Sequence, residues 1–241
     1  AVGPSGTGGR CVTGEGTQGG ADACAGWRGP RMVRAATGGV YPPESHGALH
    51  EGSPVRATDI YTISKLCAEQ LARYHALKHG SAVVIARIFN TVGRRETNAH
   101  LVPDIVAQVA RGARRVVLGN LEPRRDYVCA TDVAEALLHL GDVAMDDPVE
   151  VFNIGSGSEY SVSELVGVLS EVVGEHLDAV SAPDLQRRTD RLSQLADSGK
   201  LRRSTGWRPQ RDLRDALREV WDEARQGLVA RELARDPGGA A

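Results

Sequence analysis

The feature that most constrains the fold is an alternation of short apolar runs with helical repeats from residue 31 onward. The run SAVVIARI at residues 81–88 is apolar and rich in β-branched side chains, as in a strand buried on both faces. Just before it, residues 60–79 place apolar side chains at helical spacing. Further strands are expected at residues 31–37, 114–119, 125–130 and 149–154, and further helices at 101–111, from 131 or 132, at 161–174 and twice after 197. Strands separated by helices predict an α/β fold with a parallel sheet.

The first 30 residues differ from everything that follows. They are rich in glycine, contain almost no Leu, Ile or Val, and have no periodic apolar positions. Such a segment cannot bury enough apolar surface to offset the entropy lost on ordering. We therefore divide the chain into an irregular Gly-rich segment at residues 1–30 and a folded part at residues 31–241.

Charge and cysteine content exclude several classes of protein. The net charge of −2 provides no global basic field, so neither nucleic acid nor an anionic membrane is an expected partner. No apolar run approaches the length of a membrane span, and no signal peptide is expected. The four cysteines form neither a metal-binding spacing nor a disulfide framework. These patterns predict a cytoplasmic protein without a structural metal.

One helix carries a pair of residues that could perform acid–base chemistry. Tyr61 stands four residues before Lys65, so both side chains share one helix face. A free phenol has a pKa of about 10, and a fixed neighbouring cation lowers it toward the range of a general base. The alternative is an ordinary surface helix, because one such spacing arises by chance in roughly 6% of chains of this composition. By itself the pair is a weak signal.

Other motifs accompany the pair at ordered distances. Thr37 lies three residues before Val40-Tyr41 and 24 residues ahead of Tyr61. The motifs that follow are RIFN at 87–90, RDY at 125–127, NIGSG at 153–157, RRTD at 187–190 and an AD-x-x-K…GW signature at 196–207. Over about residues 31–225 the chain thus resembles the extended short-chain dehydrogenase/reductases, the nucleotide-sugar epimerases, dehydratases and 4-ketoreductases. Its segments GNLEPRRDY at 119–127 and STGWRP at 204–209 are most similar to the branch of this family that handles GDP-mannose and its 4-keto-6-deoxy product.

This resemblance implies a fold, a cofactor and a set of site residues. The fold would be a partial Rossmann-like parallel sheet, built from the C-terminal strands, with a small substrate-binding lobe. The cofactor would be NAD or NADP, the partner a nucleotide sugar, and a homodimer is left open. The implied roles are catalysis by Tyr61, Lys65 and Thr37, cofactor contacts from Tyr61, Lys65 and Phe89, and substrate contacts from Thr37, Asn90, Arg125, Arg187 and Asp190.

The chain departs from the family pattern at its beginning. Gly3, Gly6 and Gly9 have the spacing of the pyrophosphate-binding turn, but only two residues precede them where a buried strand is needed. About thirty residues separate this turn from Thr37, too few for the intervening strands and helices. We therefore expect that these glycines do not bind pyrophosphate, and that the first strands of the Rossmann domain are missing.

A second departure bears on the reaction. Dehydratases of this family carry a carboxylate just after the catalytic threonine, where this chain has Gly38 and Gly39. A glycine has no side chain to move a proton. The expected reaction is therefore C4 epimerisation or 4-keto reduction. The alternative is a non-catalytic remnant of the same family that binds a nucleotide sugar.

Overall fold

A computed structural model describes residues 32–96, 100–186 and 191–235, with side chains described up to residue 227. The Gly-rich segment, including Gly3, Gly6 and Gly9, lies outside the described residues. So do Arg187 and Asp190, two of the predicted substrate contacts.

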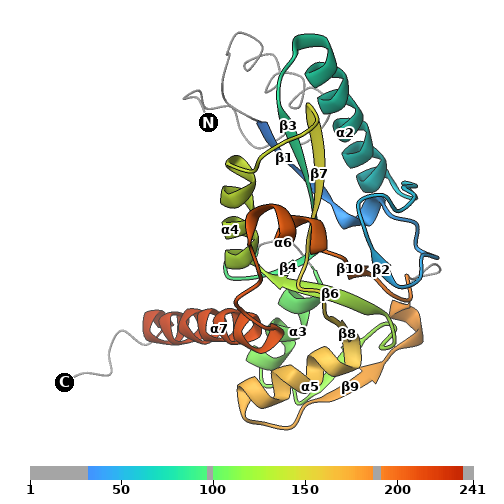
Figure 1. Cartoon of the computed structure of the whole chain (residues 1–241). Helices are drawn as coiled ribbons and strands as arrows, with labels where there is room; N and C mark the ends of the chain where they lie inside the picture. Colours follow the sequence, from blue (N-terminus) through green and yellow to red (C-terminus); the bar gives the residue numbers. More distant parts are fainter. Residues whose placement is uncertain (1–31, 97–99, 187–190, 236–241) are drawn as a thin grey trace.

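The central layer is a parallel sheet of three strands in the order β1-β3-β7 (Figure 1). The strands are β1 (Met32–Thr37), β3 (Val83–Ile88) and β7 (Val149–Ile154). All residues of β3 except the last are buried, in keeping with its continuous apolar sequence. Within the described residues, β1 forms one edge of this sheet.

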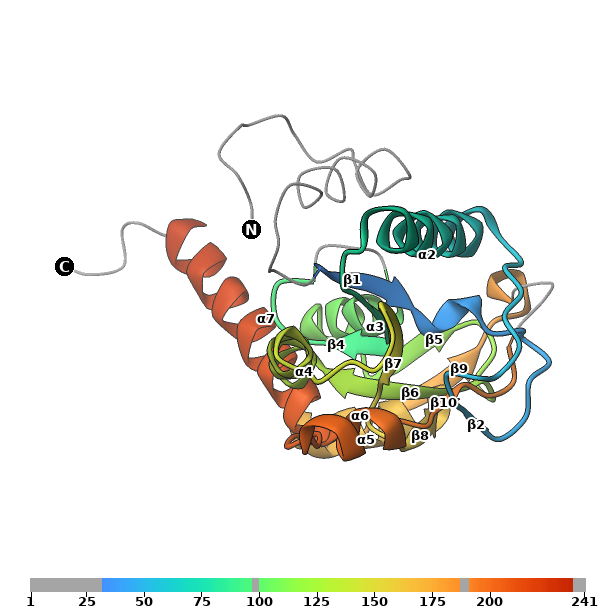
Figure 2. The ribbon, with the colours of Figure 1, turned by 45° about the horizontal axis from the view of Figure 1, so that its top comes forward.

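Helices cover both faces of the sheet (Figure 2). On one face lies α2 (Ile60–His79), whose Ala72 and Ala76 pack on Val83 and Ile85. On the other face lies α4 (Ala130–Gly141), which packs against Val84, Ala86 and Phe152. The side chains of β3 alternate between the two faces of the sheet, so this strand packs against both helices.

The remaining elements form a second core below the sheet in Figure 1. Its helices are α3 (Leu101–Ala110), α5 (Val162–Val173) and α7 (Leu213–Arg235). Its strands are β4 (Asn90–Val92), β6 (Arg124–Cys129) and β8 (Glu159–Ser161), together with the parallel pair β5 (Arg115–Leu118) and β9 (Asp178–Ser181). The two cores meet along β6, since Val128 packs with the sheet and Tyr127 with the helices below.

Short elements connect these layers. They are the 3-10 turns η1 (Gly38–Val40) and η2 (Pro183–Leu185), the strand pair β2 (Ala48–Leu49) with β10 (Leu195–Ala196), and the helix α6 (Gly199–Thr205). The turn η1 follows β1 directly and packs on α2. It carries the residues just after Thr37 into contact with the helix of Tyr61.

Local sequence signals determine where the helices begin and end. Asp59 caps α2 in a reciprocal pair with Thr62, and Gly80 ends this helix with φ +65°. Ser161 and Glu164 form the predicted capping box of α5, which ends at Gly174. The α/β class with parallel strands, predicted from the alternation of patterns, is confirmed.

Candidate functional site

The candidate site lies at the carboxyl edge of the parallel sheet. Thr37, Ile88 and Ile154 end their strands in register with one another. In open α/β sheets, ligands bind in the crevice outside this edge. The residues that follow the three strands are therefore the first candidates for contact with a ligand.

Thr37 ends β1 and caps the turn η1. Its hydroxyl oxygen accepts a hydrogen bond from the backbone N–H of Gly39 at 3.1 Å. This contact fixes the side chain and leaves the hydroxyl proton available to donate. A Cβ atom built on Gly39 would lie 3.1 Å from Cγ2 of Thr62, the residue after Tyr61. The Thr37 turn and the first turn of α2 are therefore in close contact.

Tyr61 and Lys65 form the expected pair on α2. The ammonium Nζ of Lys65 lies 5.5 Å from the centroid of the Tyr61 ring, within the range of a cation–π contact. The Tyr61 ring is 58% exposed, whereas Lys65 is half-buried. Burial, assisted by the positive charge of Arg34, lowers the pKa of Lys65. The pair is thus accessible at the tyrosine and partly shielded at the lysine.

Phe89 and Asn90 take different positions at the end of β3. Phe89 is 4% exposed and packs in a small cluster with Tyr41, Leu49 and Ala196. Its ring lies over Gly38, where a Cβ atom would come within 2.8 Å of a ring carbon. Asn90 is exposed at the start of β4. The contacts predicted for these two residues, Phe89 with cofactor and Asn90 with substrate, stay predictions.

Arg191 contacts the Thr37 turn, and Arg125 contacts Arg191. Arg125 donates to the backbone carbonyls of Arg124 and Arg191, at 2.8 and 2.6 Å. Arg191 in turn donates to the carbonyls of Gly39 and Tyr41, at 3.2 and 2.6 Å. Burial, together with the nearby charge of Arg125, lowers the pKa of Arg191 to about 10. The predicted substrate residue Arg125 is therefore connected to the Thr37 turn through Arg191.

Sequence reasoning missed Arg191, and it also missed a buried carboxylate, Asp126. Asp126 accepts hydrogen bonds from Ser156 N, Ser156 Oγ, Gly157 N and Ala196 N at 2.7–3.1 Å. It thereby ties β6 to the turn after β7 and to β10. The signal was present in the Arg-Asp-Tyr motif, where only the arginine was given a role.

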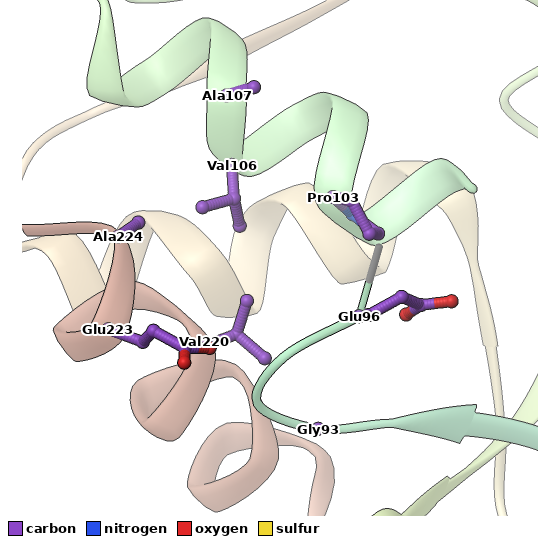
Figure 3. A pocket seen from close by; sticks show the side chains of 8 residues that line it. All are labelled: Gly93, Glu96, Pro103, Val106, Ala107, Val220, Glu223 and Ala224. Carbon is purple, nitrogen blue, oxygen red and sulfur yellow. The ribbon is translucent and has the colours of Figure 1, made fainter. Parts of the chain in front are cut away.

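A separate hollow of about 200 Å³ lies between the end of β4, α3 and α7 (Figure 3). Val106 and Val220 form part of its apolar wall, and Glu96 and Glu223 approach it from different segments. Glu223 accepts a hydrogen bond from the backbone N–H of Arg95 at 2.7 Å. None of the predicted site residues that the structure describes lines this hollow, so it is distinct from the described part of the candidate site.

In the part of the chain that the structure describes, no three His, Cys, Asp or Glu side chains gather as metal ligands would. Among the same residues, no helix has the length and apolar character needed to cross a membrane.

The chain matches a protein-family model over residues 15–155, that of the NAD-dependent epimerase/dehydratase family. It is 28% identical over 192 residues to GDP-6-deoxy-D-mannose reductase of Pseudomonas aeruginosa, covering 77% of this chain and 62% of the reductase. It is 30% identical over 208 residues to UDP-glucose 4-epimerase of Streptomyces lividans, covering 80% of this chain and 62% of the epimerase. The chain thus spans less than two thirds of the length of these relatives.

Solved structures of similar proteins have the same fold. The structure of RMD from Pseudomonas aeruginosa, complexed with NADPH, matches with a TM-score of 0.74 and 25% identity, over 82% of this chain and 67% of RMD. The structure of MoeE5 in complex with UDP-glucuronic acid and NAD matches with a TM-score of 0.78 and 27% identity, over 88% of this chain and 70% of MoeE5.

Proposed function

The chain belongs to the NAD-dependent epimerase/dehydratase family, and we propose that it modifies a nucleotide-activated sugar by C4 epimerisation or 4-keto reduction. The observation that carries this proposal is the position of the Tyr61–Lys65 pair. It lies at the carboxyl edge of the sheet, where the Thr37 turn packs on the first turn of its helix. Contact between the Thr37 turn and α2 supports a site that combines the phenol of Tyr61, the ammonium of Lys65 and the hydroxyl of Thr37.

The residues at this edge fit the nicotinamide end of NAD or NADP. No oxygen of the described residues accepts a hydrogen bond from the ammonium of Lys65, so its donors are available for the ribose hydroxyls of a cofactor. When bound, the cofactor supplies hydride transfer at the sugar carbon. Phe89 would contribute through packing under the Thr37 turn rather than through an exposed ring face.

Three side chains would then perform the proton chemistry. Tyr61 exchanges a proton with the sugar hydroxyl at the reacting carbon. Lys65 holds its ammonium 5.5 Å from the centroid of this ring, so its positive charge lies beside the phenol that exchanges the proton. Thr37 donates a hydrogen bond to the same sugar oxygen, because the contact from Gly39 N–H uses one lone pair of its oxygen and leaves its proton free.

Arginines and polar side chains would hold the rest of the substrate. Arg125, with Arg187, provides charge-assisted hydrogen bonds for the diphosphate. Asn90 and Asp190 contribute further polar contacts to the nucleotide sugar. The half-buried position of Arg125 and its contact with Arg191, which in turn contacts the Thr37 turn, support its part of this assignment.

Packing around Gly38 supports epimerisation or reduction over dehydration. Elimination of water requires a side chain that moves protons next to the catalytic threonine. At Gly38 the Phe89 ring occupies the space of even a Cβ atom, at 2.8 Å. A carboxylate at this position would require displacement of a buried aromatic ring, so the packing at residue 38 favours glycine.

The reaction is tested by incubating the protein with cofactor and nucleotide hexoses. Exchange of hydride at C4, followed by mass spectrometry of deuterium-labelled sugar, is the expected result. Stoichiometric appearance of the alkaline ultraviolet absorbance of a 4-keto-6-deoxy sugar would contradict the proposed reaction. Binding of the nucleotide sugar without any turnover would favour the alternative, a non-catalytic remnant.

We also propose that the protein forms a homodimer through the outer face of α2. Ile60, Ile63, Tyr74 and Leu77 are exposed on this helix, as two i, i+3 pairs that lie two heptads apart on one face. An exposed apolar stripe of this kind is typical of a helix that packs against a partner helix. Leu77→Glu should therefore lower the mass measured by sedimentation from dimer to monomer, whereas a monomeric parent protein would refute the dimer.

A further inference from the structure

Four buried polar residues connect the segments that carry the proposed catalytic groups. They are Glu69 on α2, Arg87 on β3, Tyr41 after the Thr37 turn and Asn153 on β7, and none is more than 4% exposed. We call these four residues the buried polar bridge. Each comes from a different segment of the chain, so the bridge exists only in the folded structure.

The contacts within the bridge are continuous. Arg87 donates to both carboxylate oxygens of Glu69, at 3.0 and 2.8 Å. A third nitrogen of Arg87 donates to the hydroxyl oxygen of Tyr41 at 3.1 Å. The Tyr41 hydroxyl donates onward to Asn153 Oδ1 at 2.8 Å. The Tyr41 hydroxyl therefore accepts from Arg87, which pairs with Glu69 on α2, and donates to Asn153 on β7. This hydroxyl is the centre of the bridge.

The charges in the bridge agree with this direction of hydrogen bonding. Burial raises the pKa of Tyr41, so the phenol stays protonated and remains a donor to Asn153. Burial alone would lower the pKa of Arg87, but hydrogen bonds and the charge of Glu69 raise it above its ordinary value. The guanidinium thus keeps its charge although it is buried.

The bridge ends close to each proposed catalytic residue. Tyr41 is four residues after Thr37, with only the short turn η1 between them. Glu69 is one helical turn after Lys65 and two turns after Tyr61. Tyr41 and Glu69 therefore connect the Thr37 turn to the helix of Tyr61 through Arg87, and Asn153 connects the same point to the end of β7.

From this arrangement, and resting on the proposed function, we propose that the buried polar bridge positions Thr37 relative to Tyr61 and Lys65. Apolar packing alone tolerates small shifts, whereas hydrogen bonds fix distance and direction. A misplacement of about 1 Å at a catalytic centre is enough to lower turnover strongly. Tyr41, Glu69, Arg87 and Asn153 are thus positioning residues that do not themselves contact the substrate.

The sharpest test removes one oxygen atom, with the variant Tyr41→Phe. The ring stays in place, while Arg87 loses an acceptor and Asn153 loses a donor. Hydrogen exchange should become faster in peptides that cover residues 37–41 and 59–65 by about tenfold, equivalent to about 1.4 kcal/mol. Exchange in α5 and α7 should remain as in the parent protein. In the nucleotide-sugar assay, kcat should fall about tenfold or more while KM changes less than twofold.

The chain offers a matched control in Tyr127→Phe. Tyr127 is also buried, and no described residue forms a hydrogen bond with its hydroxyl. Loss of this hydroxyl should leave both local exchange and kcat within about twofold of the parent protein. If Tyr41→Phe does not fold, as judged by circular dichroism, Asn153→Leu replaces it in the same assays with the same expectation.

The outcomes separate this inference from the proposed function. Exchange and kcat like those of the Tyr127→Phe control would overturn the positioning role, and so would faster exchange spread equally over α5 and α7. A parent protein without turnover would refute the proposed function. The exchange measurements would then still decide whether the bridge holds the Thr37 turn against α2.

Discussion

Two tyrosine–lysine pairs lie at opposite ends of one helix, α2, and have nearly the same geometry. The ammonium of Lys65 lies 5.5 Å from the centroid of the Tyr61 ring, and that of Lys78 lies 5.4 Å from the centroid of the Tyr74 ring. Their tyrosines are 58% and 55% exposed. Measured within the helix, the two pairs cannot be told apart.

Their surroundings differ. Tyr61 begins the helix at the carboxyl edge of the sheet, beside the Thr37 turn. The Tyr74–Lys78 pair lies in the last turns before Gly80, just ahead of the amino end of β3. Lys65 is half-buried beside the charge of Arg34, whereas Lys78 is exposed. The proposed catalytic pair is therefore distinguished from the second pair by its place relative to the sheet and not by its spacing.

The largest expected difference between the two ends is in turnover. Tyr61→Phe should lower kcat by several orders of magnitude and leave substrate affinity near that of the parent, because the ring remains while the acid–base group is lost. Tyr74→Phe, the same change in the second pair, should have no measurable effect on kcat. Equal turnover in the two variants would show that Tyr61 is not the proton-transferring group.

The second prediction concerns the buried ion pair between Glu69 and Arg87, which holds α2 between its two tyrosine–lysine pairs. Arg87→Met leaves the Glu69 carboxylate buried without its partner, which should lower the free energy of unfolding by about 3–5 kcal/mol. Denaturant titration followed by circular dichroism measures this loss. The double variant Glu69→Leu with Arg87→Met removes both charges and should recover most of the stability. Equal destabilisation in the single and double variants would mean that the unpaired charge is not the cause.

The smallest expected effect is on the pH dependence of stability. The pKa of Lys65 is lowered by burial and by Arg34, so the folded protein binds this proton less tightly than the unfolded chain. Stability should therefore rise with pH between the lowered folded-state pKa and the ordinary value, and at neutral pH the charged lysine opposes folding. Lys65→Met should slightly raise the melting temperature at pH 7 and flatten this rise. Lys78→Met serves as the exposed control, and a lower melting temperature in Lys65→Met would contradict the assigned sign.

Local patterns allowed much of the fold to be predicted. The helix at residues 60–79 was predicted from periodicity and is observed as α2 (Ile60–His79). The strand predicted at residues 81–88 is observed as β3 (Val83–Ile88), and α4 begins one residue before the predicted range. These elements depend on side-chain period and on caps, which lie within a few residues of one another.

The surroundings of the candidate site could not be predicted in the same way. Tyr41 and Asn153 are 112 residues apart in the chain, and Arg191 and Gly39 are 152 apart. No local period records such a contact, because a polar residue on a helix or strand is equally compatible with an exposed position. Glu69 illustrates this, since its position in the amphipathic pattern of α2 gives no indication that it pairs with a buried arginine.

The contact between Gly38 and Phe89 restricts the order in which this site could change during evolution. A side chain at residue 38 collides with the Phe89 ring, and that ring also packs on Tyr41, with ring centroids 6.2 Å apart. A smaller residue at position 89 would therefore have to come first, before any acidic side chain could be accepted at position 38. The intermediate would lose core packing without gaining a new reaction. Under the proposed function, a carboxylate at residue 38 is thus reached only through a sequence of substitutions whose first step is unfavourable.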